Sequence, residues 1–325
     1  MRKMKTRLTC DSEQLRHPRI HKFYKDLKRD WRLWVILLLP MLYVLIFYYG
    51  PMYGLQIAFR DYRPVHGIVG SKWVGLQWFE KFITNYQFGA IFKNTIILSL
   101  YSLVVGFPLP IIFALALNAV QSGKFKKFTQ TVSYIPHFIS LAVAVSIVNM
   151  ILSPVNGIYG NVYHLFGGEG YLQDFRSTAE AFRHIYVWSG VWQELGWNSI
   201  IYMAALSSVS HELHEAAMLD GASRWKRIWH IDFPTILPTV CIMFIMRCGS
   251  IISVGFEKVY LMQTSMNLNT AEVISTYVYK VGMSSFRNFS YGAAVGLFNT
   301  AINLVLLILV NTIVKKLSES EISLF

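Results

Sequence analysis

The sequence predicts an all-α membrane protein with six transmembrane helices and both termini in the cytoplasm. Three observations support this prediction: the composition, the lengths of the charge-free runs, and the placement of Lys and Arg. Of the 325 residues, 54% are hydrophobic and only 15% are charged, a balance that is unusual for a soluble protein. A lipid bilayer is therefore the expected solvent for most of the chain.

Charge-free runs recur along the chain at lengths suited to a bilayer. Four of them exceed the roughly 20 apolar residues that cross about 30 Å of hydrocarbon, and two more are each interrupted by one ionisable residue, Glu194 or Arg247. The runs predict helices near 34–58, 94–118, 132–153, 185–206, 236–256 and 290–314. Because the runs are continuously apolar and do not alternate with polar residues, they favour helices over a membrane barrel.

Lys and Arg are unevenly shared between the two sides of these spans. The N-terminal segment, the connections around Lys124 and at 211–235, and the C-terminal tail carry 19 of the 30 Lys and Arg residues, against 10 in the intervening connections. Since Lys and Arg favour the cytoplasmic side, both termini and 211–235 are expected to be cytoplasmic. The chain then divides into a basic N-terminal segment, 1–32, and a membrane domain, 33–325.

The net charge of +12 does not indicate a nucleic-acid-binding protein. A basic stripe that binds nucleic acid needs a soluble face on which to lie, and here the positive charge follows the predicted topology. The basic N-terminal segment is expected to rest on anionic lipid headgroups.

One polar stretch, EAAMLDGASRWKRIWHIDFP at 215–234, lies between two long apolar runs. Its first residues are strong helix formers, Gly221 gives a turn signal because glycine accepts the left-handed conformation, and Ser223 can cap a second helix. Pro234 is expected to keep Phe233 out of a helix and so to separate the stretch from the next span. The stretch predicts two short helices joined by a tight turn.

Apolar side chains recur on one face of the second short helix, at Trp225, Ile228 and Trp229. This spacing allows two interpretations. An amphipathic helix of this kind can lie on the lipid surface, or its apolar face can dock against a cytoplasmic partner protein.

The same stretch resembles the EAA signature, E-A-A-x3-G-x9-I-x-L-P, of the membrane subunits of binding-protein-dependent ABC importers. The residues that match are Glu215, Ala216, Ala217, Gly221, Ile231 and Pro234, with Phe233 in place of the usual Leu. The resemblance continues in FKNTIILSLYSLVVGFPLPIIFALALN (92–118), TVSYIPHFIS (131–140) and GFEKVYLM (255–262). In these segments the chain is most similar to permeases for complex oligosaccharides and polysaccharides, alginate importers among them.

The resemblance implies a maltose-transporter-like permease fold and a role for residues 211–235 as a coupling loop seated in a groove of an ATPase subunit. The coupling residues it implies are Glu215, Ala216, Ala217, Asp220, Gly221, Ile231 and Pro234. It further implies a second permease subunit, expected to be a different chain, two ATP-binding subunits and an extracytoplasmic solute-binding protein. The location it implies is the bacterial cytoplasmic membrane.

No ATP site is expected in this chain. The SGK sequence at 122–124 would need Gly at 118 and Ser or Thr at 125 to form a Walker A loop, but the chain has Asn118 and Phe125. We therefore expect a transport subunit that is not an enzyme and holds no cofactor, with ATP and Mg²⁺ bound by a partner.

Two ionisable residues inside predicted spans are candidates for the substrate path. Glu194 and Arg247 would each cost roughly 2.5–3.5 kcal/mol at the bilayer centre, so each should face a cavity or a partner. They are expected either to pair with each other or to contact polar substrate. Trp192, Trp197 and Tyr202 could stack on sugar rings, although aromatic residues also mark membrane interfaces.

Rival functions have weaker support in the sequence. HELHE at 211–215 lacks the second His of a zinc-protease helix, and His211, His214 and His230 offer no fixed metal geometry. A polytopic enzyme acting on lipid-linked glycans is the alternative function, and it would need an acidic pair or a metal at a membrane edge. A secondary transporter should show inverted repeats and several buried carboxylates, which the sequence does not display.

Overall fold

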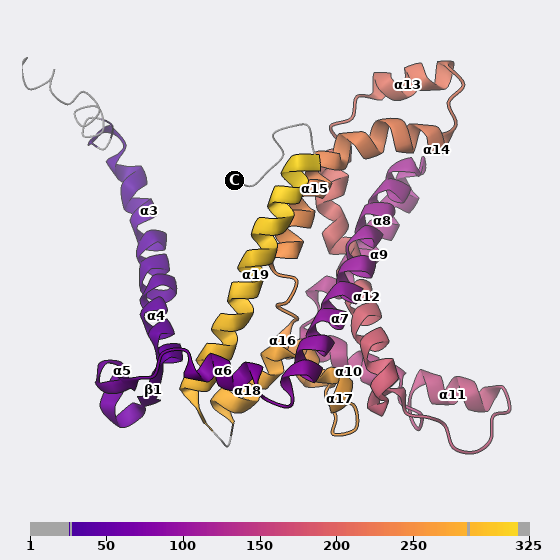
Figure 1. Ribbon diagram of the computed structural model, residues 1–325. Helices are drawn as coiled ribbons and strands as arrows, with labels where there is room; N and C mark the ends of the chain where they lie inside the picture. Colours follow the sequence, from indigo (N-terminus) through magenta and orange to yellow (C-terminus); the bar gives the residue numbers. More distant parts are fainter. Residues whose placement is uncertain (1–25, 27, 285–286, 318–325) are drawn as a thin grey trace, which may run out of the picture. The chain divides into compact units, whose positions relative to one another are not determined.

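The computed structural model describes residues 26, 28–284 and 287–317 (Figure 1). Nearly all of the basic segment predicted at 1–32 lies outside these residues. The chain divides into two compact units between Gln56 and Ile57, which are described separately below.

The described residues of the first unit form mainly one helical run. Its elements are α3 (Trp31–Val44), the π-helical turn η1 (Leu45–Tyr49) and α4 (Gly50–Met52), and the run continues through η2 (Tyr53–Phe59). No side chain of α3, η1 or α4 is buried. The wider π turn lies directly before Pro51, a residue that cannot donate a helical hydrogen bond. The run from Trp31 to Phe59 is long and apolar enough to span a membrane, as predicted for 34–58.

A small antiparallel sheet opens the second unit. Strand β1 (Arg60–Arg63) pairs with β2 (Ser71–Trp73), with Arg60 opposite Trp73. The connection between the strands contains η3 (Pro64–His66) and α5 (Gly67–Gly70), and α6 (Gln77–Ile83) follows the sheet. The sequence patterns had predicted only helices, because strands of three or four residues are too short to show a clear alternation of polar and apolar residues.

The predicted second span is confirmed as α7 (Phe88–Gly106) and α8 (Pro108–Ala119), which form one run of 32 residues.

The prediction of one helix over 132–153 was wrong. The chain instead forms α9 (Gly123–Tyr134), η4 (Ile135–Phe138) and α10 (Leu141–Ile151), with a bend of 105° between η4 and α10.

The bend has a local physical cause at Ile139 and Ser140. Ile139 is extended, and the Ser140 hydroxyl accepts a hydrogen bond from the Val143 amide, so that a new helix is capped there. The Ile139 carbonyl oxygen lies outside the helices on either side of the bend, and it accepts a hydrogen bond from Gln193 Nε2 at 3.1 Å. A composition-based reading misses this break because the segment carries no charge.

The next elements lead from one end of the second unit to the other. They are α11 (Ile158–Leu165), η5 (Phe175–Ser177), the 28-residue helix α12 (Ala179–Leu206), α13 (His211–Leu219), α14 (Arg224–Arg227), the π-helical turn η6 (Ile228–Asp232) and α15 (Phe233–Gly249). Figure 1 shows α13 and α14 at the opposite end of the unit from α11, α17 and α18.

The expectation that Pro234 would keep Phe233 out of a helix was wrong. Phe233 has helical dihedral angles, φ −64° and ψ −46°, and the chain runs as one helical stretch from Arg224 to Gly249. The π turn η6 lies just before Pro234. In this turn the backbone hydrogen bonds follow the i→i+5 pattern and not the i→i+4 pattern. The change lies where Pro234 has no N–H to donate, and the helix continues through the proline.

Four elements complete the fold: α16 (Phe256–Met262), α17 (Leu268–Ala271), α18 (Ile274–Met283) and α19 (Phe289–Leu317). Within the described residues, four helical runs are long and apolar enough to cross a membrane, or five if the bent pair counts as one span. Helix α12, which covers the predicted span 185–206, is long enough but is not among them. It carries the charged residues Glu180, Arg183 and Glu194.

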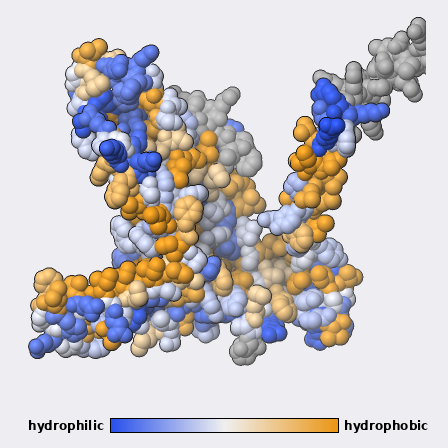
Figure 2. Space-filling model, turned by 180° about the vertical axis from the view of Figure 1, so that it is seen from behind, coloured by the Kyte–Doolittle hydropathy of each residue, from blue (hydrophilic) through white to orange (hydrophobic). Residues whose placement is uncertain are grey.

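Three buried clusters hold the second unit together. One joins α7 and α12 to α16 through Leu98, Phe182 and Val259. A second packs α6, α18 and α19 around Phe82, and a third joins α8, α12 and α15 around Tyr202 and Ile236. Figure 2 shows the remaining surface, where hydrophobic residues cover the long helices and hydrophilic residues gather over α13 and α14.

Candidate functional site: the coupling segment and the membrane cavity

Residues 211–234, here called the coupling segment after the role that the EAA resemblance implies, form the predicted helix, turn and second helix. Ser210 caps α13 and Ser223 caps α14 through their hydroxyl oxygens. Gly221 lies between the helices with φ +74°, a left-handed conformation that favours glycine. The predicted turn and second cap are confirmed.

Helix α13 makes little contact with the rest of the protein. It has no buried residue, and Glu215 and Ala216 are exposed on it. The large apolar side chain of Leu219 is 90% exposed, and that of Trp225 on α14 is 72% exposed. The segment therefore presents a free carboxylate beside apolar side chains that the described part of the chain does not cover.

Asp232 anchors this segment to the membrane helices. Its carboxylate is 3% exposed and its Oδ1 lies 3.2 Å from His214 Nε2 on α13 and 3.3 Å from Asn118 Nδ2 at the end of α8. Sequence reasoning had not assigned Asp232 a role. The sequence did contain a signal for it. Asp232 is an acidic residue directly before the apolar run of α15, and a carboxylate in that position needs polar partners.

The three histidines of the segment do not converge on a metal site. His214 pairs with Asp232, whereas His230 Nδ1 lies 2.9 Å from the Lys226 carbonyl oxygen of its own turn. Among the residues that the structure describes, no group of three or more His, Cys, Asp or Glu side chains could hold a metal ion.

The second feature is a cavity of about 420 Å³ between α7, α12, the C-terminal end of α15 and α16. Both predicted ionisable residues, Glu194 and Arg247, line it. The polar lining also includes Ser99, Ser102, Tyr186, Gln193, Asn198, Ser250, Ser253 and Lys258. Hydroxyl and amide groups of this kind can exchange hydrogen bonds with a polar substrate.

Glu194 and Arg247 share the cavity but do not form an ion pair with each other. Glu194 Oε2 lies instead 3.0 Å from His137 Nδ1. His137 belongs to η4, so this contact joins α12 to the residues just before the bend. The alternative of a Glu194–Arg247 pair is therefore wrong, because the bend that the sequence did not reveal places His137 beside Glu194.

The three aromatic candidates lie in different surroundings. Trp197 stacks on the His137 ring, with centroids 4.1 Å apart and planes at 6°. Trp192 lines a separate apolar groove, and Tyr202 is buried in the cluster around Ile236. None of the three is among the residues that line the cavity of Glu194 and Arg247.

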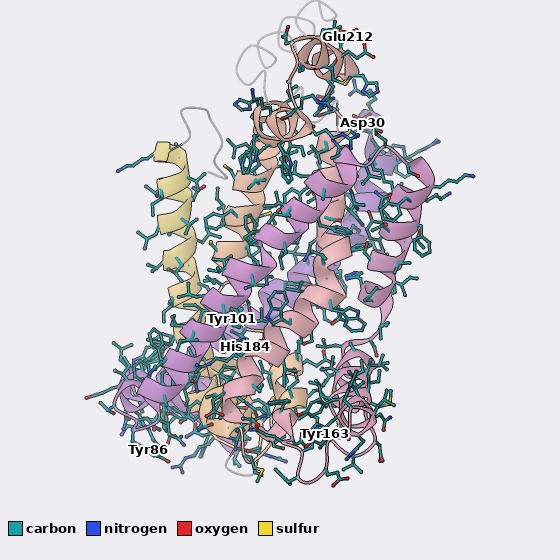
Figure 3. The ribbon with its side chains drawn as sticks, turned by 90° about the vertical axis from the view of Figure 1, so that its right-hand side faces the viewer. Asp30, Tyr86, Tyr101, Tyr163, His184 and Glu212 are labelled. Atoms are coloured by element: carbon teal, nitrogen blue, oxygen red, sulfur yellow. The ribbon has the colours of Figure 1, made fainter. Side chains whose placement is uncertain are left out.

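Near that apolar groove, a polar contact joins α7 to α12. Tyr101 and His184 lie beside each other in Figure 3, with Tyr101 Oη 2.8 Å from His184 Nδ1, and Trp188 Nε1 donates to the same hydroxyl at 3.2 Å. In the same view Glu212 lies at one end of the unit, and Tyr86 and Tyr163 lie at the other. The coupling segment and the α11 region are thus separated by the length of the long helices.

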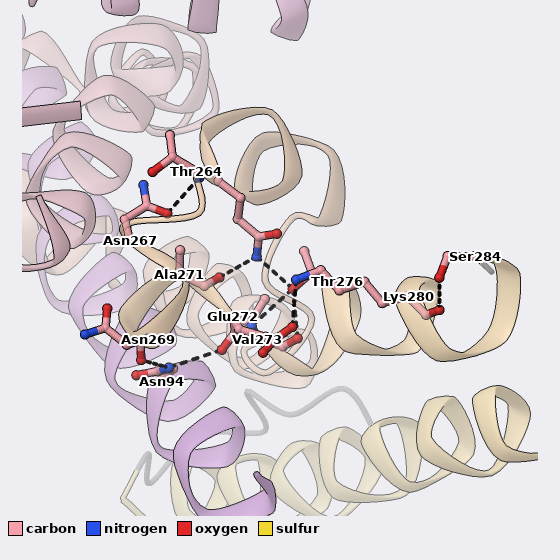
Figure 4. A network of polar contacts seen from close by, with 11 residues as sticks. Asn94, Thr264, Asn267, Asn269, Ala271, Glu272, Val273, Thr276, Lys280 and Ser284 are labelled. Atoms are coloured by element: carbon pink, nitrogen blue, oxygen red, sulfur yellow. Dashed lines mark hydrogen bonds and ion pairs between the residues drawn. The ribbon is translucent and has the colours of Figure 1, made fainter. Parts of the chain in front are cut away.

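The connection between α16 and α18, which contains the short helix α17 and lies at the end opposite the coupling segment, is fixed by side-chain hydrogen bonds (Figure 4). Asn94 Nδ2 donates to the carbonyl oxygens of Asn269 and Glu272, at 2.8 and 3.2 Å. Gln263 Nε2 donates to the Ala271 carbonyl oxygen and to Thr276 Oγ1. These bonds hold an irregular segment against α7 in one arrangement.

Comparison with known proteins identifies the family of this chain. Residues 106–319, which include both features apart from a few lining residues of α7, match the family described as binding-protein-dependent transport system inner membrane component. The chain belongs to this family. It is a permease subunit of an ABC importer, a multi-pass protein of the bacterial cytoplasmic membrane, and ATP hydrolysis belongs to partner subunits.

Two curated relatives from Bacillus subtilis (strain 168) are similar along nearly the whole chain. The polygalacturonan/rhamnogalacturonan transport system permease protein YteP is 41% identical over 89% of each chain. Protein LplB is 40% identical over 90% of this chain and 91% of its own. This permease is therefore similar to a polysaccharide-transport permease over about nine tenths of its length.

A solved structure of a bacterial ABC transporter involved in the import of the acidic polysaccharide alginate contains a chain of the same fold. It is 38% identical and covers 92% of this permease and 100% of that chain, with a TM-score of 0.82. A second structure, of the alginate transporter in complex with its alginate pentasaccharide-bound periplasmic protein, matches with the same TM-score over 91% of this permease and 98% of that chain. The predicted ABC importer permease fold is confirmed, whereas the bent pair stands in place of one predicted straight span.

Proposed function

We propose that this permease forms the path for oligosaccharide or polysaccharide fragments as one half of a pair with a second, different permease. Two ATP-binding subunits would hydrolyse ATP, and an extracytoplasmic solute-binding protein would deliver the fragment. The relatives named above carry polygalacturonan, rhamnogalacturonan and alginate in their descriptions, which supports a glycan substrate. An enzyme acting on lipid-linked glycans gains no support from these relatives.

The proposed topology has six spans and both termini in the cytoplasm. Helix α12 would be the additional span beside the five apolar runs, because its 28 residues measure about 42 Å at 1.5 Å per residue. The ends of the unit support this topology, since the coupling segment and the C-terminal end of α19 lie together at one end (Figure 1).

The coupling segment is proposed to dock on an ATP-binding subunit. The observation that carries this proposal is the exposure of Glu215, Leu219 and Trp225 on a segment that Asp232 and His214 tie to the membrane helices. A carboxylate beside unburied apolar side chains suits a protein interface with an apolar core and a polar rim. The bonds of Asp232 would transmit movement of the docked helix to α8 and α15.

The cavity between α7, α12, α15 and α16 is proposed to be part of the substrate path. The polar lining supports this role, because Ser102, Gln193 and Asn198 can exchange hydrogen bonds with the hydroxyl groups of a glycan. The loop that Asn94 holds would face the solute-binding protein on the outer side.

Reconstitution with the partner subunits tests this function. The complete importer in vesicles should accumulate radiolabelled oligogalacturonate only when ATP is inside and the binding protein is outside. A Leu219→Cys variant should cross-link to the ATP-binding subunit, whereas a cysteine at the exposed residue Tyr86, at the opposite end of the unit (Figure 3), should not. Cross-linking from Tyr86 and not from Leu219 would overturn the proposed topology and docking site.

A further inference from the structure

We propose that Lys258, together with Arg247, binds carboxylate groups of an acidic glycan inside the membrane cavity. The inference rests on the function proposed above and adds the charge of the substrate and the residues that recognise it. Both side chains line the cavity. Sequence reasoning placed Lys258 in an outer connection and gave it no role.

Lys258 is a buried cation with few partners. Its residue is 8% exposed, and its Nζ donates a hydrogen bond to the Tyr186 carbonyl oxygen at 2.9 Å. The same Nζ lies 4.8 Å from the centroid of the Tyr186 ring. An ammonium group carries three N–H donors, so Tyr186 leaves donor capacity free for a further acceptor.

One carboxylate, that of Glu194, shares the cavity with this cation but does not form an ion pair with it. Glu194 is the only acidic residue in the cavity lining, and its Oε2 is held by His137. Lys280, by contrast, has a carboxylate partner in Glu272 at 2.7 Å. Among the described residues, no carboxylate lies within ion-pair distance of Lys258 or of Arg247. Burial of an uncompensated charge is costly, and an anionic substrate would offset that cost.

The local fold keeps space for the ammonium group. Gly190 lies one helical turn from Tyr186 and one turn from Glu194, so all three belong to one face of α12. A Cβ atom at Gly190 would come within 3.1 Å of Lys258 Nζ. Glycine at this position therefore leaves room for the ammonium beside the α12 backbone, and a side chain there would press against it.

A uronate residue fits this site better than a neutral sugar does. The serine and amide side chains of the lining suffice for the hydroxyl groups that every sugar carries, but they do not explain why the lining holds two cations and only one carboxylate. A uronate carboxylate is ionised at neutral pH and accepts charge-assisted hydrogen bonds from ammonium and guanidinium groups, which are stronger than bonds between neutral groups. The lining therefore favours carboxylate-bearing fragments.

The test uses the complete importer in vesicles and two probes, trigalacturonate and its methyl ester, which differ in charge. Lys258→Met and Arg247→Met should each raise the apparent KM for trigalacturonate, Lys258→Met by about tenfold or more because it removes a buried cationic partner of the anion. The KM for the methyl ester should change much less.

Two matched variants separate charge recognition from a structural role. Glu194→Gln keeps a hydrogen-bonding group toward His137 but removes the opposing charge, so the KM for trigalacturonate should fall or stay unchanged. Lys93→Met removes an exposed cation of α7 outside the cavity lining and should leave both probes unaffected. If Lys258→Met does not assemble, Lys258→Gln, which keeps hydrogen-bond donors but removes the charge, should give the same selective rise in KM.

The outcomes distinguish the two proposals. Unchanged uptake of trigalacturonate in Lys258→Met, or an equal loss for both probes, would overturn carboxylate recognition while leaving the glycan importer intact. If the parental importer accumulates neither probe although the binding protein stimulates its ATP hydrolysis, the glycan function itself fails. A selective loss for the acidic probe supports both proposals.

Discussion

His214 Nε2 lies 3.2 Å from Asp232 Oδ1 and joins the two halves of the coupling segment across the Gly221 turn. Asn118 Nδ2 reaches the same carboxylate oxygen from α8. One buried carboxylate thus connects the exposed helix α13, the π turn before α15, and a membrane helix. Movement of α13 cannot occur independently of these helices while the contacts hold.

Removing the imidazole tests this connection. We expect His214→Ala to lower the stability of the purified permease complex by about 1–3 kcal/mol, because the buried Asp232 carboxylate loses a partner. Scanning fluorimetry of the complex measures the change, and binding-protein-stimulated ATP hydrolysis should fall with it. His211→Ala is the matched control, since His211 is exposed on the same helix. Equal melting temperatures for the two variants would contradict the role of the pair.

Gly221 should tolerate a side chain poorly because of its backbone and not because of crowding. Nothing lies within 4 Å of a Cβ placed there, but φ is +74°, a conformation that costs a β-branched residue about 1–2 kcal/mol or more. Gly221→Val should reduce co-purification of the ATP-binding subunit. Gly123→Val, which also meets no neighbour and has no positive φ, should not. Normal co-purification in Gly221→Val would show that the turn geometry is unimportant.

Gly196 allows α12 to approach α9 closely. A Cβ atom there would lie 2.2 Å from the Ser133 carbonyl oxygen, so Gly196→Ala must move one of the two helices. Overpacking of this kind costs typically about 1–3 kcal/mol, and we expect a lower melting temperature and a lower membrane level. Gly296→Ala in α19, where a Cβ meets nothing within 4 Å, serves as the control. A Gly196→Ala protein as stable as the control would argue against this helix contact.

The segment before α12 should show a pH-dependent contribution to stability. The Arg176 side chain bonds the Asp174 carboxylate at 2.6 and 2.7 Å and lowers the pKa of that carboxyl group below its usual value. A lowered folded pKa stabilises the protein above the unfolded pKa of about 3.9, and this contribution is lost as the pH falls through the folded pKa.

Asp174→Asn should therefore destabilise the protein at pH 7 by about 1 kcal/mol or less, since the pair is partly exposed. The difference in melting temperature between parent and variant should shrink as the pH falls below about 4. Glu169→Gln, which changes an exposed carboxylate of the same connection, should show no such trend. A difference that stays constant with pH would contradict the assigned pair.

Residue patterns were sufficient for features that depend on local chemistry. The left-handed glycine at Gly221 and the cap at Ser223 follow from residue type and spacing, and the structure confirms both. The apolar runs of α7, α8 and α19 are long enough to need no tertiary information. Glu194 and Arg247 could be assigned to a cavity because lipid offers them no partner.

Features that depend on contacts distant in sequence could not be predicted in this way. The bend after Phe138 is stabilised by Gln193 from α12, 54 residues along the chain from Ile139. The same bend gives Glu194 its partner His137, which ruled out the expected pair with Arg247. Lys258 was missed because its burial against Tyr186 and Gly190 arises only when α16 packs on α12.

The most direct test of the coupling role compares two carboxylates on one helix. Glu215 and Glu212 are both exposed on α13, and exposed ion pairs contribute only about 0–1 kcal/mol to folding, so neither Glu215→Ala nor Glu212→Ala should alter membrane level. At a docked interface, loss of a desolvated charge partner costs about 2–5 kcal/mol. Binding-protein-stimulated ATP hydrolysis in the reconstituted importer should therefore collapse in Glu215→Ala and stay near the parental rate in Glu212→Ala. Parental stimulation and transport in Glu215→Ala would contradict the account of α13 as the coupling helix.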